Sequence, residues 1–368
     1  MNMKLPSRIA YLIVLTLLSS AVLAMFVSPA GLHSGINQHP RAKFLDMVEG
    51  KADKPFVYRT LLPTAVRAIS LVVPDQWQQA CADMVEQHGP VRTLNALGWE
   101  SQGAFQYLSA SVLMLVCFMG FGHCAVRLTQ RVCDVRDTGL TRLLLITAAM
   151  VGLPPFFKYT SYPYDPPQLF LFTLALYFLA VHRARAFCIT FVCCCLNKET
   201  AVLLIPLYAL VFRNRCASRR QYWGTLLGLA VVYAGIKSGL TWVFHDNPGG
   251  FVDFQLRRNI IWLTQGWTFT DLGVFAVAVA LVFFRWREKP AFLKVSLFCV
   301  LPPLVVLALF LGWVDEWRGY YEAYPIVFGL IVYSILRFND LFGKVAKPPD
   351  RKMPSPTNGR QNATVDRG

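Results

Sequence analysis

Long apolar stretches recur along this chain from near its first residue to about residue 336. Hydrophobic residues make up 55% of the 368 residues, and charged residues make up only 15%. Stretches of this length suit the hydrocarbon core of a bilayer better than the interior of a soluble domain. In lipid, only helices and closed barrels satisfy every backbone polar group. The sequence therefore predicts an all-α, polytopic transmembrane helical bundle.

The apolar pattern predicts eight full membrane spans, at 9–27, 104–126, 143–157, 167–181, 222–244, 272–284, 291–313 and 324–336. Several are shorter than the roughly 20 residues that a span needs, so flanking aromatic or polar residues must complete them. The first follows Lys4 and Arg8, as in a signal peptide, and Val22-Leu23-Ala24 resembles a cleavage site. Because this run is long enough to span and more spans follow, a retained signal-anchor helix is favoured.

Positive charge lies mainly in short loops between these spans, at 127–142, 182–186, 213–220 and 285–290. By the positive-inside rule these loops belong in the cytoplasm, which places both termini there too. The net charge of +15 then reflects membrane orientation rather than nucleic-acid binding. We expect a transmembrane domain over 1–340 in the cell (inner) membrane. The Pro-rich, polar tail at 341–368 is expected to be disordered in the cytoplasm.

The run "FVCCCLNKETAVLLIPLY" has a polar centre inside an apolar segment. Since the loops before and after it are both basic, the chain between them must cross an even number of times. We therefore predict a short helical hairpin at 187–212 that turns near Asn197–Thr200. Each arm reaches only about 15–18 Å against a core of about 30 Å, as in re-entrant segments. The alternative is one long span in which Lys198 and Glu199 neutralise each other.

The two long outer loops, 28–103 and 245–271, hold many of the acidic residues, so functional groups are expected on the outer face. In the first loop, Tyr58 and Arg59 precede the short apolar segment 61–73, which is predicted to be a helix lying in the interface. A guanidinium there suits a lipid phosphate because its donors form a fork. A snorkelling anchor would explain Arg59 equally well.

Three further polar positions lie at predicted outer ends of spans. Asp165 in "YPYDPPQLF" precedes two prolines and is predicted to cap a helix, with Lys158 in the same loop. In "VDEWRGYYEAYP", Arg318 and Glu322 are four residues apart and are predicted to share a helix face. Lys237 lies inside a span, where a charge is a candidate functional residue. A helix cap with an aromatic interface belt is the simpler interpretation of the Asp165 region.

Other chemistry is not indicated. The ten cysteines show neither a pairing pattern nor metal-ligand spacing, so no structural disulfide and no cysteine-bound metal is expected. The six histidines form no cluster in the sequence. "GFG" at 120–122 lacks the strand–turn–helix setting of a nucleotide-binding fingerprint.

The order of these motifs resembles the GT-C superfamily of polytopic glycosyltransferases. A signal-anchor helix is followed by "PFVYRTLLP" in an acid-bearing outer loop, "YPYDPPQLF" opens a span, "LNKETAVLLIP" forms the hairpin and "EWRGYYEAYP" enters the last span. The likeness covers roughly residues 9–340. It implies inverting transfer of a sugar from a polyprenyl-phosphate donor to a lipid or glycan acceptor at the outer membrane face. It implies no cofactor and leaves a divalent cation open.

The resemblance also implies roles for residues. The general base for the acceptor hydroxyl is expected in the first outer loop, with Asp46 as the best match and Glu49 and Asp53 behind it. The hairpin would carry Lys198 to the outer interface, with Glu199 holding it. The residues implied in substrate and phosphate binding are Tyr58, Arg59, Lys158, Asp165, Lys198, Glu199, Arg318 and Glu322.

Two other functions compete with this one. The chain could be a transporter or flippase of a lipid-linked or anionic substrate, although no repeat between its halves is evident. It could also be a non-catalytic membrane relative, which the lack of a paired-acid motif favours.

Overall fold

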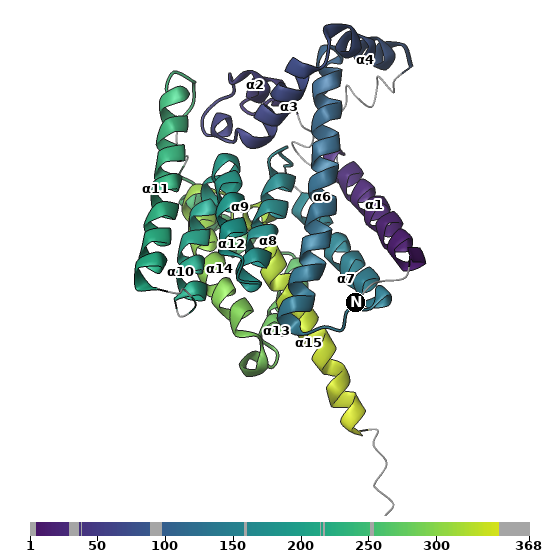
Figure 1. Cartoon of the computed structure of the whole chain (residues 1–368), viewed down its shortest axis with the longest axis vertical. Coiled ribbons are helices and arrows are strands. Elements are labelled where there is room, and N and C mark those ends of the chain that lie inside the picture. Colours follow the sequence, from purple (N-terminus) through teal and green to yellow (C-terminus); the bar gives the residue numbers. More distant parts are fainter. Residues whose placement is uncertain are drawn as a thin grey trace, which may run out of the picture.

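The computed structural model describes residues 5–28, 37, 39–88, 98–157, 160–213, 215, 218–250 and 254–345. Over these ranges the chain is helical and contains no β-strand. The predicted all-α class is confirmed. The long helix α6 (Ala104–Cys133) runs through the molecule, with α1 (Leu5–Val27) and α7 (Gly139–Val151) on one side and the remaining bundle on the other (Figure 1).

Five helical segments are long and apolar enough to cross a membrane: α1, α6, α7 with the following turn, α11 (Arg219–Val243) and α14 (Ala291–Leu311). A sixth results if α12 (Leu256–Gln265) and α13 (Phe269–Phe283), bent by 96°, are counted as one. Two further helices complete the bundle, α8 (Asp165–Ala180) and α15 (Tyr324–Val345). This set is compatible with the predicted helical membrane protein.

Two apolar cores hold the bundle together. One joins α1, α6 and α7, where the rings of Phe26, Phe118 and Phe157 meet edge to face. The other lies among α8, α14, α15 and the segment between α8 and α11, around buried residues such as Phe191 and Leu207. Helix α11, in contrast, is exposed along nearly its whole length.

The segment between α8 and α11 folds back on itself. It consists of α9 (Ala184–Asn197), the short helix η4 (Glu199–Leu203) and α10 (Leu204–Phe212). The ring of Phe187, near the start of α9, lies 5.4 Å from that of Tyr208 in α10, and the ring of His182 lies 5.9 Å from that of Phe212. The two helices therefore run antiparallel, and the "NKET" turn lies at their far end.

The first loop contains α2 (Phe44–Glu49), η1 (Phe56–Tyr58), α3 (Leu61–Val72) and α4 (Asp75–His88), at the top of Figure 1. Thr60 N donates to Leu196 O at 3.0 Å, which ties this loop to the end of α9. Lys54 N donates to Pro248 O at 2.8 Å beyond α11. At Gly249 the backbone has φ +91°, and an added Cβ would lie 2.6 Å from Lys54 O, so only glycine permits this approach.

The bent pair α12–α13 is held mainly at its ends. Asn259 in α12 donates to the carbonyl oxygens of Ala308, Leu309 and Gly312 at 2.8–3.0 Å. After α13, Lys289 Nζ donates to Leu330 O and Ser334 Oγ, each at 2.7 Å. Between these ends, residues 272–277 are exposed on every face of the helix.

Candidate functional site

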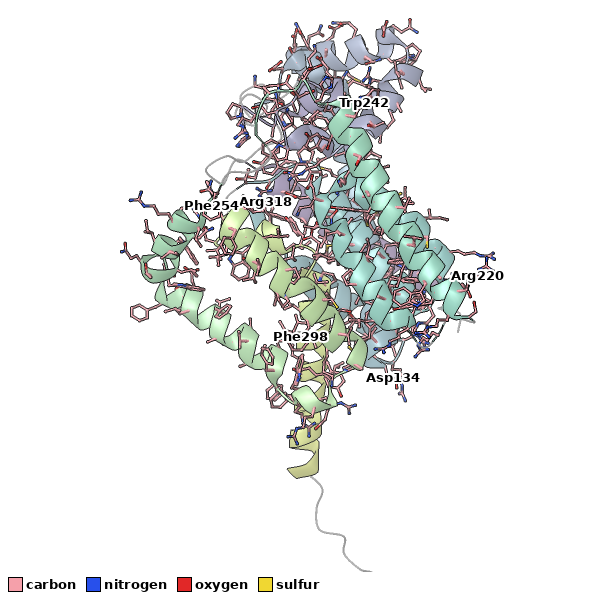
Figure 2. All side chains as sticks on the ribbon, turned by 90° about the vertical axis from the view of Figure 1, so that its left-hand side faces the viewer. Asp134, Arg220, Trp242, Phe254, Phe298 and Arg318 are labelled. Atoms are coloured by element: carbon pink, nitrogen blue, oxygen red, sulfur yellow. The ribbon has the colours of Figure 1, made fainter. Side chains whose placement is uncertain are left out.

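Charged side chains from four segments meet beneath the first loop. The segments are the η1–α3 junction, the start of α8, the α9–η4 turn and the stretch before α15 that includes η6 (Trp317–Tyr320). We call this group the polar cluster; its members are Arg59, Tyr164, Asp165, Lys198, Glu199, Glu316, Arg318 and Glu322. Figure 2 shows Arg318 in the upper half of the molecule, toward the first loop.

Arg59 joins the first loop to both α8 and the hairpin. Its Nη1 donates to the Tyr164 hydroxyl, and its guanidinium carbon lies 4.2 Å from the centre of that ring. Its Nη2 lies 3.7 Å from Oε2 of Glu199. The Arg59 side chain is only 13% exposed, so its charge is neutralised mainly by protein groups.

Arg318 occupies an equivalent position on the neighbouring ring. Its guanidinium binds Glu316 in bidentate fashion, at 2.5 and 3.0 Å, and lies 4.3 Å from the centre of the Tyr162 ring. Its Nη1 is 4.0 Å from Oδ2 of Asp165. The rings of Tyr162 and Tyr164 stack at 5.2 Å, so the "YPY" spacing supplies two adjoining aromatic faces, one for each arginine.

Lys198 forms the third cationic position. Its Nζ lies 3.2 Å from Oε1 of Glu322, and both side chains are almost completely buried. The same carboxylate accepts from Gln168 Nε2 at 3.1 Å and from the Thr200 hydroxyl. Asn197 Nδ2 donates to Tyr164 O and Gln168 Oε1, which fixes the turn against the start of α8.

Asp165 does not cap α8 as the sequence predicted. It is the first helical residue, and its Oδ2 accepts from the backbone N of Tyr162 at 3.2 Å. Burial raises the pKa of this carboxyl above its ordinary value, while the nearby charges of Arg318, Lys198 and Arg59 oppose the rise. The aspartate thus faces the polar cluster rather than the helix backbone.

Two other predicted pairings are different in the structure. Lys198 pairs with Glu322, and Glu199 pairs with Arg59, so Glu199 does not hold Lys198. Arg318 and Glu322 precede α15 and do not share a helix face; each binds its own partner. The adjacent residues Lys198 and Glu199 of "NKET" therefore bind different partners within one network. Local sequence spacing could not reveal this, because both partners come from distant segments.

Several buried polar atoms in and beside the cluster have no hydrogen-bond partner among the residues that the structure describes. They are Arg59 Nε, Asp165 Oδ1, Asn197 Oδ1, Glu199 Oε1, Lys237 Nζ and Glu322 Oε2. Buried polar groups are normally satisfied, so the network retains both donor and acceptor capacity. Lys237 in α11 lies within electrostatic reach of Glu199 and completes the set of nearby cations.

The first-loop acids lie apart from these contacts. Asp46 is half-buried in the first turn of α2 and forms no ion pair with any described residue. Glu49 pairs with Lys51 at 2.7 Å on the surface, and Asp53 pairs with Arg41 at 3.2 Å. None of the three carboxylates contacts a cluster member that the structure describes.

Two more predicted residues need separate mention. Tyr58 is buried, with its hydroxyl interacting with Thr241 and its ring 6.5 Å from that of Phe244, so it packs on α11 beside the cluster. Lys158 lies outside the described residues.

Comparison with known proteins provides no relative for this chain. No family model matches it. No curated protein and no solved structure matches it either. The site must therefore be interpreted from its own chemistry.

The three cations of the cluster, each paired with a carboxylate, are of the kinds that proteins use for anionic ligands. Arg59 and Arg318 offer guanidinium forks, and Lys198 offers a compact charge, all of which bind phosphate well. Among the described residues there is no group of three or more His, Cys, Asp or Glu side chains that could hold a metal ion, and the described cysteines are free.

Sequence reasoning missed six residues of this network: Tyr162, Tyr164, Gln168, Asn197, Thr200 and Glu316. The "YPY" repeat held the signal for the tyrosines, since two rings two residues apart next to "DPP" can stack. Nothing local marked Gln168 or Glu316.

Proposed function

We propose that this chain is a GT-C-like membrane glycosyltransferase. It would move a sugar from a polyprenyl-phosphate donor to a lipid or glycan acceptor at the outer face of the cell membrane. The observation that carries the proposal is the polar cluster, which gathers three cations from segments far apart in the sequence at one end of the bundle. These cations include Arg59, Lys198 and Arg318, which the resemblance had implied in phosphate binding.

The proposed topology has eight spans plus the re-entrant hairpin, with both termini in the cytoplasm. The polar cluster then lies on the outer side, because the basic loops lie at the other ends of its helices. The position of Arg220 at the lower end of α11, below Trp242 at its upper end, supports this arrangement (Figure 2).

Each cation in the cluster already has a carboxylate partner. Glu199, Glu316 and Glu322 keep three nearly buried cations neutralised, because an unpaired buried charge is costly. A donor phosphate would bind by displacing one carboxylate from its cation. Glu199, whose side chain is 42% exposed, is the partner that can turn toward water when displaced. The unpartnered Arg59 Nε would donate an additional hydrogen bond to the phosphate.

The transfer step follows from this placement. A carboxylate takes the proton of the acceptor hydroxyl, and the acceptor oxygen attacks the anomeric carbon from the side opposite the phosphate. The bond from that carbon to the phosphate oxygen breaks, and the electron pair leaves on the polyprenyl phosphate. Arg59, Arg318 and Lys198 stabilise the charge that develops on this leaving group.

Two carboxylates compete for the role of base. The resemblance implies Asp46, with Glu49 and Asp53 behind it. The geometry favours Glu199, whose side chain is 42% exposed and 3.7 Å from Arg59. Burial raises the pKa of Glu199, but the charges of Arg59, Lys237 and Lys198 outweigh it and hold that pKa below its ordinary value. Glu199 is then ionised at neutral pH, as a base must be.

The direct experiment compares the membrane glycolipids and polysaccharides of a strain lacking the protein with those of its parent. Loss of one sugar substituent is expected, restored by the wild-type gene. The variants Arg59→Ala and Arg318→Ala should not restore it. Arg67→Ala should restore it, since Arg67 lies exposed on α3 in the same loop. An unchanged glycan profile in the deletion strain would contradict the proposal.

A transporter or flippase is the second candidate, and the broken helices favour it. The α9–η4–α10 segment and the 96° bend between α12 and α13 resemble the interrupted helices that line transport sites. Reconstitution separates the two functions. A transporter moves a labelled lipid-linked sugar between leaflets without forming a glycosidic bond, whereas a transferase yields a new glycosylated product. Binding of the donor with neither outcome identifies a non-catalytic relative.

A further inference from the structure

A second charged site lies at the other end of α11 from the polar cluster. Helix α11 has 25 residues, so its ends are roughly 37 Å apart. Tyr233 and Lys237 lie in the second half of α11 and face the tip of the hairpin, where Tyr233 donates to Glu199 O at 3.0 Å. Arg219 and Arg220 lie at the lower end of α11 (Figure 2). The two sites thus belong to opposite sides of the proposed membrane.

An open pocket of about 450 Å³ lies between the end of α10 and the start of α11. It is lined mainly by Leu210, Arg213, Ser218, Arg219, Tyr222 and Trp223. The Tyr222 hydroxyl donates to Ala209 O at 3.0 Å, which fixes one wall to α10. Two guanidinium groups and two aromatic side chains therefore line one concave surface.

The arginines around this pocket have no acidic partner in the part of the chain that the structure describes. Arg213, Arg215, Arg219 and Arg220 form no ion pair with any described residue, and the sequence contains no Asp or Glu between Glu199 and Asp246. The basic segment at 182–186 likewise forms no ion pair with a described residue, whereas two other basic loops contain such pairs. Arg127 and Arg142 pair with Asp137, and Arg285 pairs with Glu288. The positive-inside rule accounts for the side of the membrane but not for a pocket lined by two of these arginines.

The surroundings of the pocket identify the class of anion. Trp223 is 57% exposed, and Leu227, one helical turn further along the same face, is also exposed. This apolar face continues from the pocket along α11, most of whose residues are not buried by the rest of the described chain. A ligand that fills both surfaces needs an anionic head and an apolar tail.

We propose that the α10–α11 pocket binds the headgroup of an anionic phospholipid from the cytoplasmic leaflet of the proposed membrane. Its phosphate lies between Arg213 and Arg219, and its acyl chains follow Trp223 and Leu227. The N-terminus of α11, capped by Ser218 Oγ accepting from Gln221 N at 3.1 Å, adds favourable dipole charge. This site does not depend on the proposed sugar transfer.

The test uses the purified full-length protein in phosphatidylcholine nanodiscs, to which phosphatidylglycerol is added. Native mass spectrometry counts retained lipid, and thermal unfolding reports stabilisation. The double variant R213Q/R219Q should weaken the apparent affinity for phosphatidylglycerol by roughly 30-fold, since each arginine near an anionic headgroup contributes about a fivefold factor. The matched control R183Q/R185Q removes the same charge from the start of α9 and should bind like the wild type.

Unfolding of both variants in pure phosphatidylcholine checks that neither change damages the fold. Equal loss of binding in R183Q/R185Q would overturn the proposed pocket, because the net charge of the protein would then explain the binding. Equal retention of phosphatidylcholine and phosphatidylglycerol by the wild type would overturn it as well. So would an equal stabilisation by inorganic phosphate, because that result assigns the site to a soluble anion.

Discussion

Lys198 Nζ lies 3.2 Å from Oε1 of Glu322, although 124 positions separate the two residues in the chain. The Glu322 side chain is fully buried and the Lys198 side chain is 10% exposed. The pair joins the tip of the hairpin to the segment that precedes α15. Among the described residues, neither charge has another opposite charge so close, so each depends mainly on the other for neutralisation.

Breaking this pair should destabilise the protein strongly. Lys198→Met or Glu322→Gln leaves one buried charge unpaired, at a cost of about 3–5 kcal/mol. The double variant should recover much of that loss, because no charge is then stranded. Thermal or denaturant unfolding in detergent measures all three. The exposed pair of Lys51 and Glu49 provides the control, and its double-mutant cycle should show no measurable coupling. Additive effects at Lys198 and Glu322 would refute a coupled pair.

Arg59 should be required for binding a polyprenyl phosphate. Arg59→Ala removes both a fork and a charge from a nearly buried position, and a charge-assisted bond there is worth about 1.5–3 kcal/mol, or roughly 10- to 150-fold in affinity. Arg59→Lys should recover only part, since lysine neither forks nor stacks as well on Tyr164. Fluorescent polyprenyl phosphate titrated into purified protein reports the affinity. Arg67→Ala is the control, and equal loss there would assign the effect to surface charge.

The sequence predicted the class of the fold well, because hydrophobic runs report directly on burial or lipid contact. It also marked Arg59, Asp165, Lys198, Glu199, Arg318 and Glu322, which the structure places in one cluster. The ion-pair partners of these residues could not be predicted from the sequence. Lys198 and Glu199 are adjacent, and in an extended turn adjacent side chains point in different directions, so each met a partner from a distant segment.

The base assignment can be decided by neutral replacements. If the first-loop mechanism holds, Asp46→Asn abolishes sugar transfer while donor binding persists. If Glu199 is the base, Glu199→Gln abolishes transfer and Asp46→Asn does not. Glu49→Gln and Asp53→Asn test the other first-loop positions. Single-turnover transfer and donor binding should be measured together on each variant. Retained transfer in all four variants would exclude a carboxylate base from this set.

Stability should depend on pH in opposite ways at two aspartates. The pKa of buried Asp165 is raised from 3.8, so its contribution is present below that pH and is lost as pH rises through the folded-state value. The Arg142 guanidinium beside Asp137 lowers the pKa of that carboxyl, so its contribution is present above pH 3.8 and is lost as pH falls. Between pH 3 and pH 7, Asp165 makes the free energy of unfolding decrease with rising pH, and Asp165→Asn should remove that decrease. Asp137 makes the free energy of unfolding increase with rising pH, and Asp137→Asn should remove that increase. Identical pH profiles in the two variants would contradict these assignments.

The proposed topology can be mapped with single cysteines in a background lacking the native ones. Cysteine at exposed Glu49 should react with an impermeant maleimide from outside. Cysteines at Arg185 and Arg215 should react only after the cytoplasmic face is opened. Labelling of Arg185 and Arg215 from opposite sides would show that the segment between them crosses the membrane an odd number of times.

The middle of α13 exposes residues 272–277 on every face, while Asn259 and Lys289 fix the two ends of the bent arm. Exchanging one exposed apolar side chain for another in that middle opens no buried cavity, so it should cost little, except at Phe275, whose ring lies 5.6 Å from that of Trp267. Replacing Asn259 leaves three backbone carbonyls of the α14 end without their donor, and replacing Lys289 removes the donor shared by two groups of α15. Mutations along this arm should therefore be least tolerated at Asn259 and Lys289. The helix between them can vary in sequence as long as its side chains stay apolar.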